Sequence, residues 1–152
     1  EELRRNYDFY QEVTLHHSSL STCIFGIVAC KIGYYTEACR YFQQSARMDL
    51  DDYHNNFYAG IHAANMAGTW QAIVNGFAGL YLKDGCLHFR PYLPEQWEGY
   101  EFHLRVKDCV LGVRIHGREA AFTLCEGNDL VFYVKEKKVQ LNEQGGSYIE
   151  NI

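Results

Sequence analysis

The sequence lacks any concentration of basic residues. Its net charge is −5 over 152 residues, and no basic run is longer than a pair such as Lys137-Lys138. Proteins that bind nucleic-acid phosphates gather Lys and Arg on one face. Nucleic acid is therefore not an expected partner. The balance of 47% hydrophobic and 22% charged residues is that of a globular chain.

Cysteines at the spacing of metal or redox motifs are also missing. No C-x-x-C occurs, and the six cysteines are widely spaced at Cys23, Cys30, Cys39, Cys86, Cys109 and Cys125. Each lies in an apolar run or beside an expected strand, which is typical of small buried side chains in a reducing compartment. We expect neither a metal site nor a disulfide framework, and we expect a cytoplasmic protein.

No apolar run is long enough to cross a membrane. The longest covers residues 23–30, whereas a spanning helix needs about 20 residues. The polar start EELRRNYDFYQE does not have the pattern of a signal peptide, so a membrane is not an expected partner. The chain also has no initiator methionine and opens within a helical pattern. We therefore expect it to be a piece of a longer protein.

The spacing of apolar residues changes near residue 83. Before it, apolar residues recur at helical spacing, as in residues 35–46 and 70–81. After it, they alternate with polar residues, as strands of a half-buried sheet do. The pattern predicts an α+β chain, with helices over residues 1–83, short antiparallel strands over 84–142, and a flexible tail over 143–152.

Helix boundaries are expected at residues with cap chemistry. Ser19 or Ser21 is expected to cap a helix that ends at Gly33, and Thr36 a second helix that ends near Met48. The two would form an antiparallel hairpin. The first helix is apolar on almost every side, which predicts more neighbouring helices than this chain supplies.

The hairpin is expected to return the chain to the end where it began. A helix of about 13 residues is about 20 Å long. The segment DLDDYHNNFYAGIHAANMAGTW, residues 49–70, should therefore lie near TLHHSSLS, residues 14–21. Ser18, Ser19 and Ser21 offer three hydroxyls where one helix cap needs one.

The returning segment adds further polar groups. Glycines at 60 and 68 permit close backbone approach, and His62 lies between them. Thr69 is expected to open the helix of Trp70, whose first N–H groups would point at an anion placed there. These groups are consistent with an oxyanion site.

Each of these residues also has a plain structural interpretation. The serines are ordinary helix caps, and His62 is an ordinary helix or loop histidine. Three aspartates fit a solvated turn in which one anchors Arg47 or a sugar hydroxyl; they are Asp49, Asp51 and Asp52. His16 and His17 are adjacent and point apart, which does not favour a metal. The residues alone leave the structural and the anion-binding interpretations open.

Three strings carry a family resemblance: TLHHSSLS, ARMDLDDYHNNFYAGIHAANMAGTWQAIVNGFAGL and LHFRPYLPEQWEGYEFHLRVKDCVLGVRI. Together they resemble the C-terminal third of glycoside hydrolase family 65, which contains maltose, trehalose, kojibiose and nigerose phosphorylases. The resemblance covers roughly residues 14–141. It implies the C-terminal helices of an (α/α)6 catalytic barrel, followed by a small, sandwich-like antiparallel β-sheet domain.

The resemblance also implies an activity. Phosphorylases of this family cleave an α-glucoside with inversion, use inorganic phosphate as the nucleophile, and release β-glucose 1-phosphate. Carried over motif by motif, the phosphate-binding residues are Ser18, Ser19, His62, Gly68 and Thr69. Phosphate is a co-substrate, and no cofactor is expected.

The sequence departs from the family pattern at Ala67, where G-G-T-W is expected and A-G-T-W stands. In addition, no segment matches the motif of the general-acid glutamate, which inverting cleavage requires. We therefore expect no catalytic residue in this chain and no activity of the chain alone. The expected partners are a disaccharide, phosphate and the remainder of the barrel, and a homodimer is compatible with the sequence.

Two alternatives stay open. A family 65 hydrolase, such as a trehalase-like enzyme, needs a carboxylate to activate water, and the absence of Asp and Glu between Gly60 and Trp70 favours a phosphorylase. The hairpin GYYTEACRYFQQSARMDL also resembles a tetratricopeptide unit of a non-catalytic interaction module. No second copy follows at a period of about 34 residues, which disfavours that module.

The C-terminal half contains no constellation with an evident chemistry. We expect it to support the barrel, and PYLPEQW resembles a family linker in which Pro91 and Pro94 fix an extended chain. His88, His103 and His116 are expected to face solvent.

Overall fold

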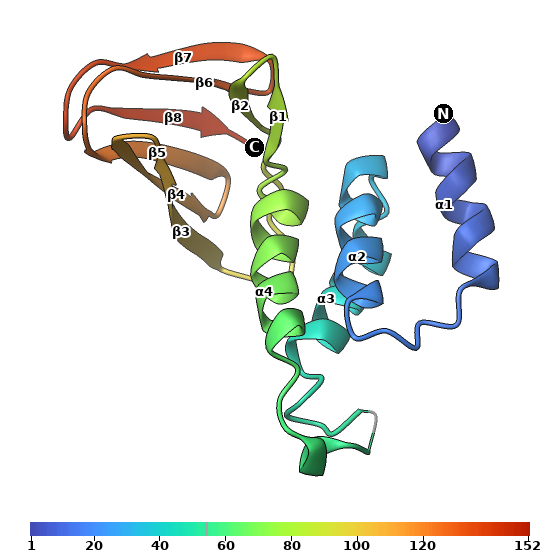
Figure 1. The fold of residues 1–152 in the computed structure, drawn as a ribbon. Helices are drawn as coiled ribbons and strands as arrows, with labels where there is room; N and C mark the ends of the chain where they lie inside the picture. The colour runs from blue at the N-terminus through green and yellow to red at the C-terminus, as the bar shows by residue number, and fades with distance from the viewer. Residues whose placement is uncertain (54) are drawn as a thin grey trace. The chain divides into compact units, whose positions relative to one another are not determined.

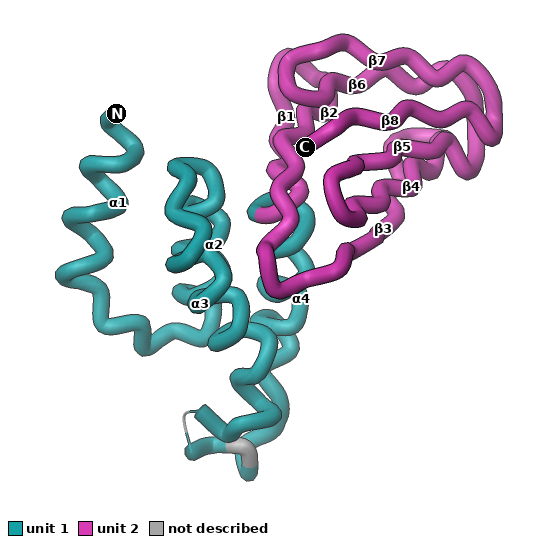
Figure 2. The backbone as a smooth tube through the Cα atoms, turned by 180° about the vertical axis from the view of Figure 1, so that it is seen from behind, with its two compact units in different colours: residues 1–76 teal, residues 77–152 magenta. Residues whose placement is uncertain are grey.

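A computed structural model describes residues 1–53 and 55–152. The chain divides into two compact units, residues 1–76 (unit 1) and 77–152 (unit 2), which Figure 2 shows in different colours. The division falls before the expected boundary at residue 83. Residues 77 and 78 already hydrogen-bond with the β-unit, because the Phe77 carbonyl accepts Tyr92 N–H at 2.7 Å and the Ala78 carbonyl accepts Arg90 N–H at 3.2 Å.

Unit 1 is helical, as the apolar spacing predicts (Figure 1). Its elements are α1 (Glu2–Val13), α2 (Ser21–Ile32), α3 (Tyr35–Ala46), a 3-10 turn (Phe57–Ala59), α4 (Ala63–Gln71) and a π-helical segment (Ala72–Phe77) that reaches the first residue of unit 2. No helix among the described residues is both long and apolar enough to cross a membrane.

The hairpin of α2 and α3 has the expected turn. Gly33 ends α2 with φ +83°, a left-handed conformation that glycine adopts without a Cβ penalty, so the predicted end of this helix is confirmed. At Gly26 the helices come close, since a Cβ added there would lie 3.3 Å from the Cβ of Tyr41. A small residue at this crossing lets α2 and α3 pack tightly.

The predicted helix caps are wrong. The cap positions of α2 and α3 are Leu20 and Tyr34, and neither makes a side-chain cap hydrogen bond. Ser21 is the first residue of α2, and its hydroxyl is 2.7 Å from the His16 ring instead. Thr36 lies inside the first turn of α3.

The predicted start of the fourth helix is also wrong. Thr69 does not open it, because α4 begins at Ala63 and continues through Gly68 to Gln71. The Thr69 hydroxyl donates to the Asn65 carbonyl one turn earlier at 3.0 Å, as hydroxyls within helices do. His62 is the residue that precedes the first turn.

Unit 2 consists of two four-stranded sheets, with the orders β1-β2-β6-β7 and β3-β4-β5-β8. The strands are β1 (Tyr81–Lys83), β2 (Cys86–Phe89), β3 (Gly99–Val106), β4 (Cys109–His116), β5 (Glu119–Glu126), β6 (Leu130–Val134), β7 (Lys137–Leu141) and β8 (Ser147–Asn151). Phe89 of the first sheet meets Phe122 of the second, with ring centroids 5.0 Å apart and both side chains almost fully buried. The chain is thus an α+β chain with a sandwich-like β-unit, as expected.

One strand pair differs from the all-antiparallel expectation. β2 pairs with β6 in parallel, with Leu87 opposite Phe132. The long connection through β3, β4 and β5 allows this pairing, since parallel neighbours need a crossover and not a tight turn.

His88 was predicted to face solvent, but it is buried. It is 6% exposed and stacks between Tyr81 and Tyr133, its partners on β1 and β6, at centroid distances of 5.0 and 4.4 Å. Neighbouring strands supply a ring on each side, which single-strand alternation does not reveal. His103 and His116 are exposed, as predicted.

The prediction of a flexible tail over residues 143–152 is wrong, because this segment contains β8. Ser147–Asn151 pair with β5 in antiparallel register, with Glu150 opposite Ala120. Glu150 is 9% exposed, accepts a hydrogen bond from the Tyr148 hydroxyl, and lies 3.0 Å from the Lys137 ammonium. These bonds join β8 to β7 as well as to β5.

The Glu150 carboxylate is expected to make stability depend on pH. The Tyr148 hydroxyl, followed by Lys137, holds the pKa of Glu150 below its ordinary value of 4.5. The carboxylate therefore stabilises the fold above about pH 4.5, and this contribution is lost as pH falls through the lower folded pKa. Glu150→Gln should flatten the fall of the thermal midpoint between about pH 6 and pH 3. Circular dichroism measures the thermal midpoint at each pH, and Glu143→Gln at an exposed position is the control. The same dependence of the midpoint on pH in both variants would contradict the prediction.

Candidate anion-binding site at one end of the helical unit

Three helix ends of unit 1 come together. The start of α2, the end of α3 and the start of α4 lie at the same end of the unit (Figure 1). A Cβ built on Gly68 of α4 would lie 3.8 Å from the side chain of Leu20, the residue that follows Ser18 and Ser19 and precedes α2. The hairpin geometry thus brings the two polar segments to a common end.

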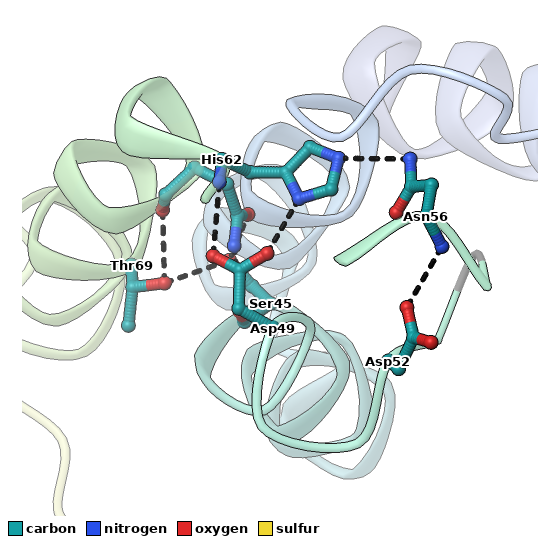
Figure 3. A network of polar contacts seen from close by, with 7 residues as sticks. Ser45, Asp49, Asp52, Asn56, His62 and Thr69 are labelled. Carbon is teal, nitrogen blue, oxygen red and sulfur yellow. Dashed lines mark hydrogen bonds and ion pairs between the residues drawn. The ribbon is translucent and has the colours of Figure 1, made fainter. Parts of the chain in front are cut away.

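His62 is held by Asp49. The Asp49 carboxylate accepts the backbone N–H of His62 at 3.0 Å, and its other oxygen is 2.5 Å from Nδ1 of the ring (Figure 3). The two side chains are 19% and 21% exposed, so the pair is shielded but reachable. The hydrogen bond from the His62 side chain is the main cause that lowers the pKa of Asp49 below 3.8, and burial opposes it.

The other ring nitrogen of His62 faces Asn56. Nε2 is 3.4 Å from the Asn56 amide nitrogen. Asn56 is in turn fixed through its backbone N–H, which donates to the Asp52 carboxylate at 2.8 Å (Figure 3). Both ring nitrogens of His62 therefore have polar neighbours, and they come from the segment between α3 and α4.

Thr69 belongs to a second polar group, which is more deeply buried. Its hydroxyl is 2.9 Å from the hydroxyl of Ser45 on α3. Ser45 donates to the Asn65 side-chain oxygen at 2.8 Å, and the Asn65 amide donates to the Ser45 carbonyl at 2.7 Å. Ser45 and Asn65 are 1% and 2% exposed. Because buried polar groups are costly when unpaired, this network fixes α4 against α3.

Gly68 lies where α4 meets α2. A Cβ at this position would be only 2.6 Å from the Cys23 sulfur and 3.2 Å from the Cys23 Cβ. Backbone N–H groups inside a helix donate to carbonyls of the same helix, so the Gly68 N–H is not suited to binding an anion. Gly68 is instead suited to setting the distance between α2 and α4. Ala67, the departure from the family pattern, is exposed and away from this contact.

The serine segment before α2 has one exposed and one half-buried hydroxyl. Ser18 is exposed, and its hydroxyl accepts the Leu20 N–H at 3.3 Å. Ser19 is half-buried. The exposed Ser18 hydroxyl keeps its hydrogen available for a ligand, since it acts as an acceptor in this bond.

The two adjacent histidines have different surroundings. The His16 ring lies 2.7 Å from the Ser21 hydroxyl and 3.3 Å from that of Tyr41, whereas His17 is exposed. Burial, and then the Arg40 guanidinium, lower the pKa of His16, which favours a neutral ring. His16 therefore braces the segment that carries Ser18.

Comparison with known proteins decides the family. Residues 1–71 match the glycosyl hydrolase family 65 central catalytic domain, and residues 80–141 match the C-terminal domain of the same family. The first range lies within unit 1 and the second within unit 2. The chain belongs to glycoside hydrolase family 65.

Relatives in family 65 match along most of this chain. An α,α-trehalose phosphorylase of Thermoanaerobacter brockii is 46% identical over 94% of this chain and 18% of its own length. A maltose phosphorylase of Bacillus subtilis is 36% identical over 93% of this chain and 19% of its own length. A solved structure, provisionally assigned as a kojibiose phosphorylase from the human microbiome, is 36% identical with a TM-score of 0.91, over 99% of this chain and 20% of its own length. The chain thus spans about a fifth of the length of these relatives.

Four side chains of this candidate site were not singled out as site residues from the sequence: Ser45, Asp49, Asn56 and Asn65. Asp49 was interpreted as one of three turn aspartates. The expected link from that turn to Arg47 exists, at 2.6 Å, but Asp51 makes it. The helical spacing of Asn65 and Thr69 was a usable signal, since residues four apart share a helix face.

Proposed function

We propose that this chain is the C-terminal part of a family 65 α-glucoside phosphorylase and that it contributes the phosphate-binding site. Ser18, Ser19, His62 and Thr69 would bind the phosphate, with Thr69 exchanging its hydrogen bond to the Asn65 carbonyl for one to a phosphate oxygen. Gly68 would set the spacing between α2 and α4. The observation that carries the proposal is that the start of α2, the end of α3 and the start of α4 lie at one end of unit 1, where Asp49 holds His62 and Ser45 contacts Thr69. The names of the relatives, which are phosphorylases of trehalose, maltose and kojibiose, support it.

The proposed reaction is inversion at the anomeric carbon. A phosphate oxygen forms the new C–O bond on the face opposite the leaving oxygen, the glycosidic C–O bond breaks, and a general acid protonates the leaving sugar. The products would be β-glucose 1-phosphate and the second sugar. The hydroxyl and imidazole groups of the site would orient the charged phosphate, which lowers the barrier by proximity. The acid would come from a part of the barrel outside this chain.

The carboxylates near the site favour phosphate over water as the nucleophile. A hydrolase needs a base whose pKa is near the working pH. No Asp or Glu lies between Gly60 and Trp70, and the nearby Asp49 is engaged twice by His62 with its pKa lowered. A carboxylate in this state is a weak base, which supports phosphorolysis.

Exposed apolar side chains support the remaining barrel as a partner. Large hydrophobic residues stand out from α1, the loop that follows it, α2 and α4: Phe9, Val13, Leu15, Ile24 and Trp70 are 48–78% exposed. Apolar surface of this extent usually marks an interface. These side chains would pack against the other helices of an (α/α)6 barrel. A homodimer and a cytoplasmic location stay predictions.

The test compares the complete enzyme with and without phosphate. With a disaccharide substrate such as trehalose, maltose or kojibiose, phosphate should produce β-glucose 1-phosphate, identified by its anomeric proton signal. Release of free glucose alone would contradict a phosphorylase and favour the hydrolase. The isolated 152 residues should show no turnover under the same conditions, and turnover would contradict the placement of the acid outside this chain.

A further inference from the structure

Asp49 makes two hydrogen bonds to one residue, His62. We propose that Asp49 is a positioning residue, which fixes the orientation of the His62 ring so that Nε2 faces the phosphate. This inference rests on the proposed function and adds a residue that the family motifs did not indicate.

The two bonds hold His62 at two points, its backbone N–H and its ring. Asp49 follows α3, His62 precedes α4, and the two residues are 13 apart in the sequence. One carboxylate oxygen holds the backbone N–H at 3.0 Å, and the other is 2.5 Å from Nδ1. Rotation of the His62 side chain would break the ring bond while the backbone bond stays in place. The carboxylate thus selects one side-chain orientation.

The same contact sets the hydrogen on Nδ1. An ionised carboxylate only accepts hydrogen bonds, and the lowered pKa of Asp49 keeps it ionised, so Nδ1 must carry a hydrogen. Nε2 is then the ring nitrogen that faces away from Asp49. Inorganic phosphate carries both acceptor oxygens and a P–OH donor, so it can hydrogen-bond to a ring held in this orientation.

Asn56 is suited to occupy Nε2 when phosphate is absent. Its amide lies 3.4 Å from Nε2, and its backbone is tied to Asp52. A side-chain amide offers a donor on one atom and an acceptor on the other, so Asn56 matches the ring with or without a hydrogen on Nε2. The ring is 21% exposed, which leaves a phosphate able to reach it.

A role in helix capping explains only part of this geometry. Asp49 accepts an N–H at the start of α4, as a capping side chain does. The bond to the ring nitrogen is not needed for a cap. The experiment must therefore separate an effect on phosphate from an effect on stability.

The test is a double-mutant cycle in the complete enzyme. Asp49→Asn, His62→Gln and their combination are compared by phosphate KM and kcat at saturating disaccharide. Asp49→Asn should raise the phosphate KM about tenfold, in the range seen when residues that orient a ligand-binding histidine are lost. On the His62→Gln background the same change should have no further effect, because Asp49 acts through the ring. Asp51→Asn is the matched control, since Asp51 pairs with Arg47 on the surface.

The outcomes are distinct. If His62→Gln raises the phosphate KM while Asp49→Asn behaves like Asp51→Asn, the inference fails and the proposed function stands. An equal effect of Asp49→Asn on both backgrounds also overturns it, because Asp49 then acts without His62. A lower thermal midpoint with an unchanged phosphate KM reduces Asp49 to a helix cap. If His62→Gln leaves the phosphate KM unchanged, the phosphate-site assignment itself fails.

Discussion

Replacement of His62 by glutamine in the complete enzyme is expected to lower kcat/KM for phosphate about 100-fold, the cost typical of losing one preorganised donor to a developing or bound anion. Glutamine keeps a polar side chain but removes the ring that lies 2.5 Å from the Asp49 carboxylate. The KM for the disaccharide should change little, because the proposed role of His62 is toward phosphate alone.

Initial rates at varied phosphate and fixed disaccharide measure this effect. His103→Gln is a matched control, because His103 is an exposed histidine on β3 of unit 2. A loss that appears equally for both substrates would argue for damage to the fold. A loss confined to the disaccharide would contradict the assignment of His62 to phosphate.

Replacement of Gly68 by alanine is expected to destabilise the helical unit by about 1–3 kcal/mol, the usual cost of overpacking. The new methyl would lie 2.6 Å from the sulfur of Cys23, a buried side chain on α2 that has little room to move. Helix propensity acts in the opposite direction, since alanine in place of a helical glycine stabilises by about 1 kcal/mol. The sign of the measured change therefore decides between packing and propensity.

Urea unfolding followed by circular dichroism gives the change in the free energy of unfolding. Cys23→Ala provides the matched test, because it removes the atom that the new methyl meets. The cost of Gly68→Ala should be smaller on the Cys23→Ala background than on the original one. An increase in stability for Gly68→Ala on the original background would contradict the packing role.

The site as proposed has two layers with different functions. The buried Ser45 and Asn65 and the half-buried Thr69 form a network that connects α3 with α4. His62 and Asp49 form a pair with about a fifth of each side chain exposed. The buried network is suited to fixing the helix ends, and the exposed pair is suited to meeting a ligand. Anion recognition needs polar groups that are held in place by a rigid support.

Several features of the chain were predictable because they depend on local chemistry. The change of apolar spacing near residue 83 separates helices from strands, since helices and strands expose side chains at different periods. Gly33 predicts the end of α2, because a left-handed residue at that position favours glycine. Three sequence strings identify the family, which the matches to both of its domains confirm.

Other features were decided by side-chain and strand contacts that the pattern of residue types does not reveal. The prediction that Ser21 caps α2 was wrong, because its hydroxyl contacts the His16 ring and not a backbone N–H. The tail was expected to be flexible, but β8 forms because β5 offers it an edge and Lys137 and Tyr148 bind Glu150. His88 is buried because strands on both sides supply tyrosines. Tyr148 and His16 lie close in the sequence to the residues they contact, but Lys137, Tyr81 and Tyr133 come from neighbouring strands.

The sequence by itself determined the fold class, the helical hairpin and the family, because apolar periodicity, a left-handed glycine and ordered motifs are properties of short segments. Only the tertiary structure decided that α4 begins at Ala63, that Gly68 is a contact with Cys23, and that Asp49 is the partner of His62. The physical reason is that a hydrogen bond between residues 13 apart depends on how the chain between them folds, and that fold depends on packing across helices.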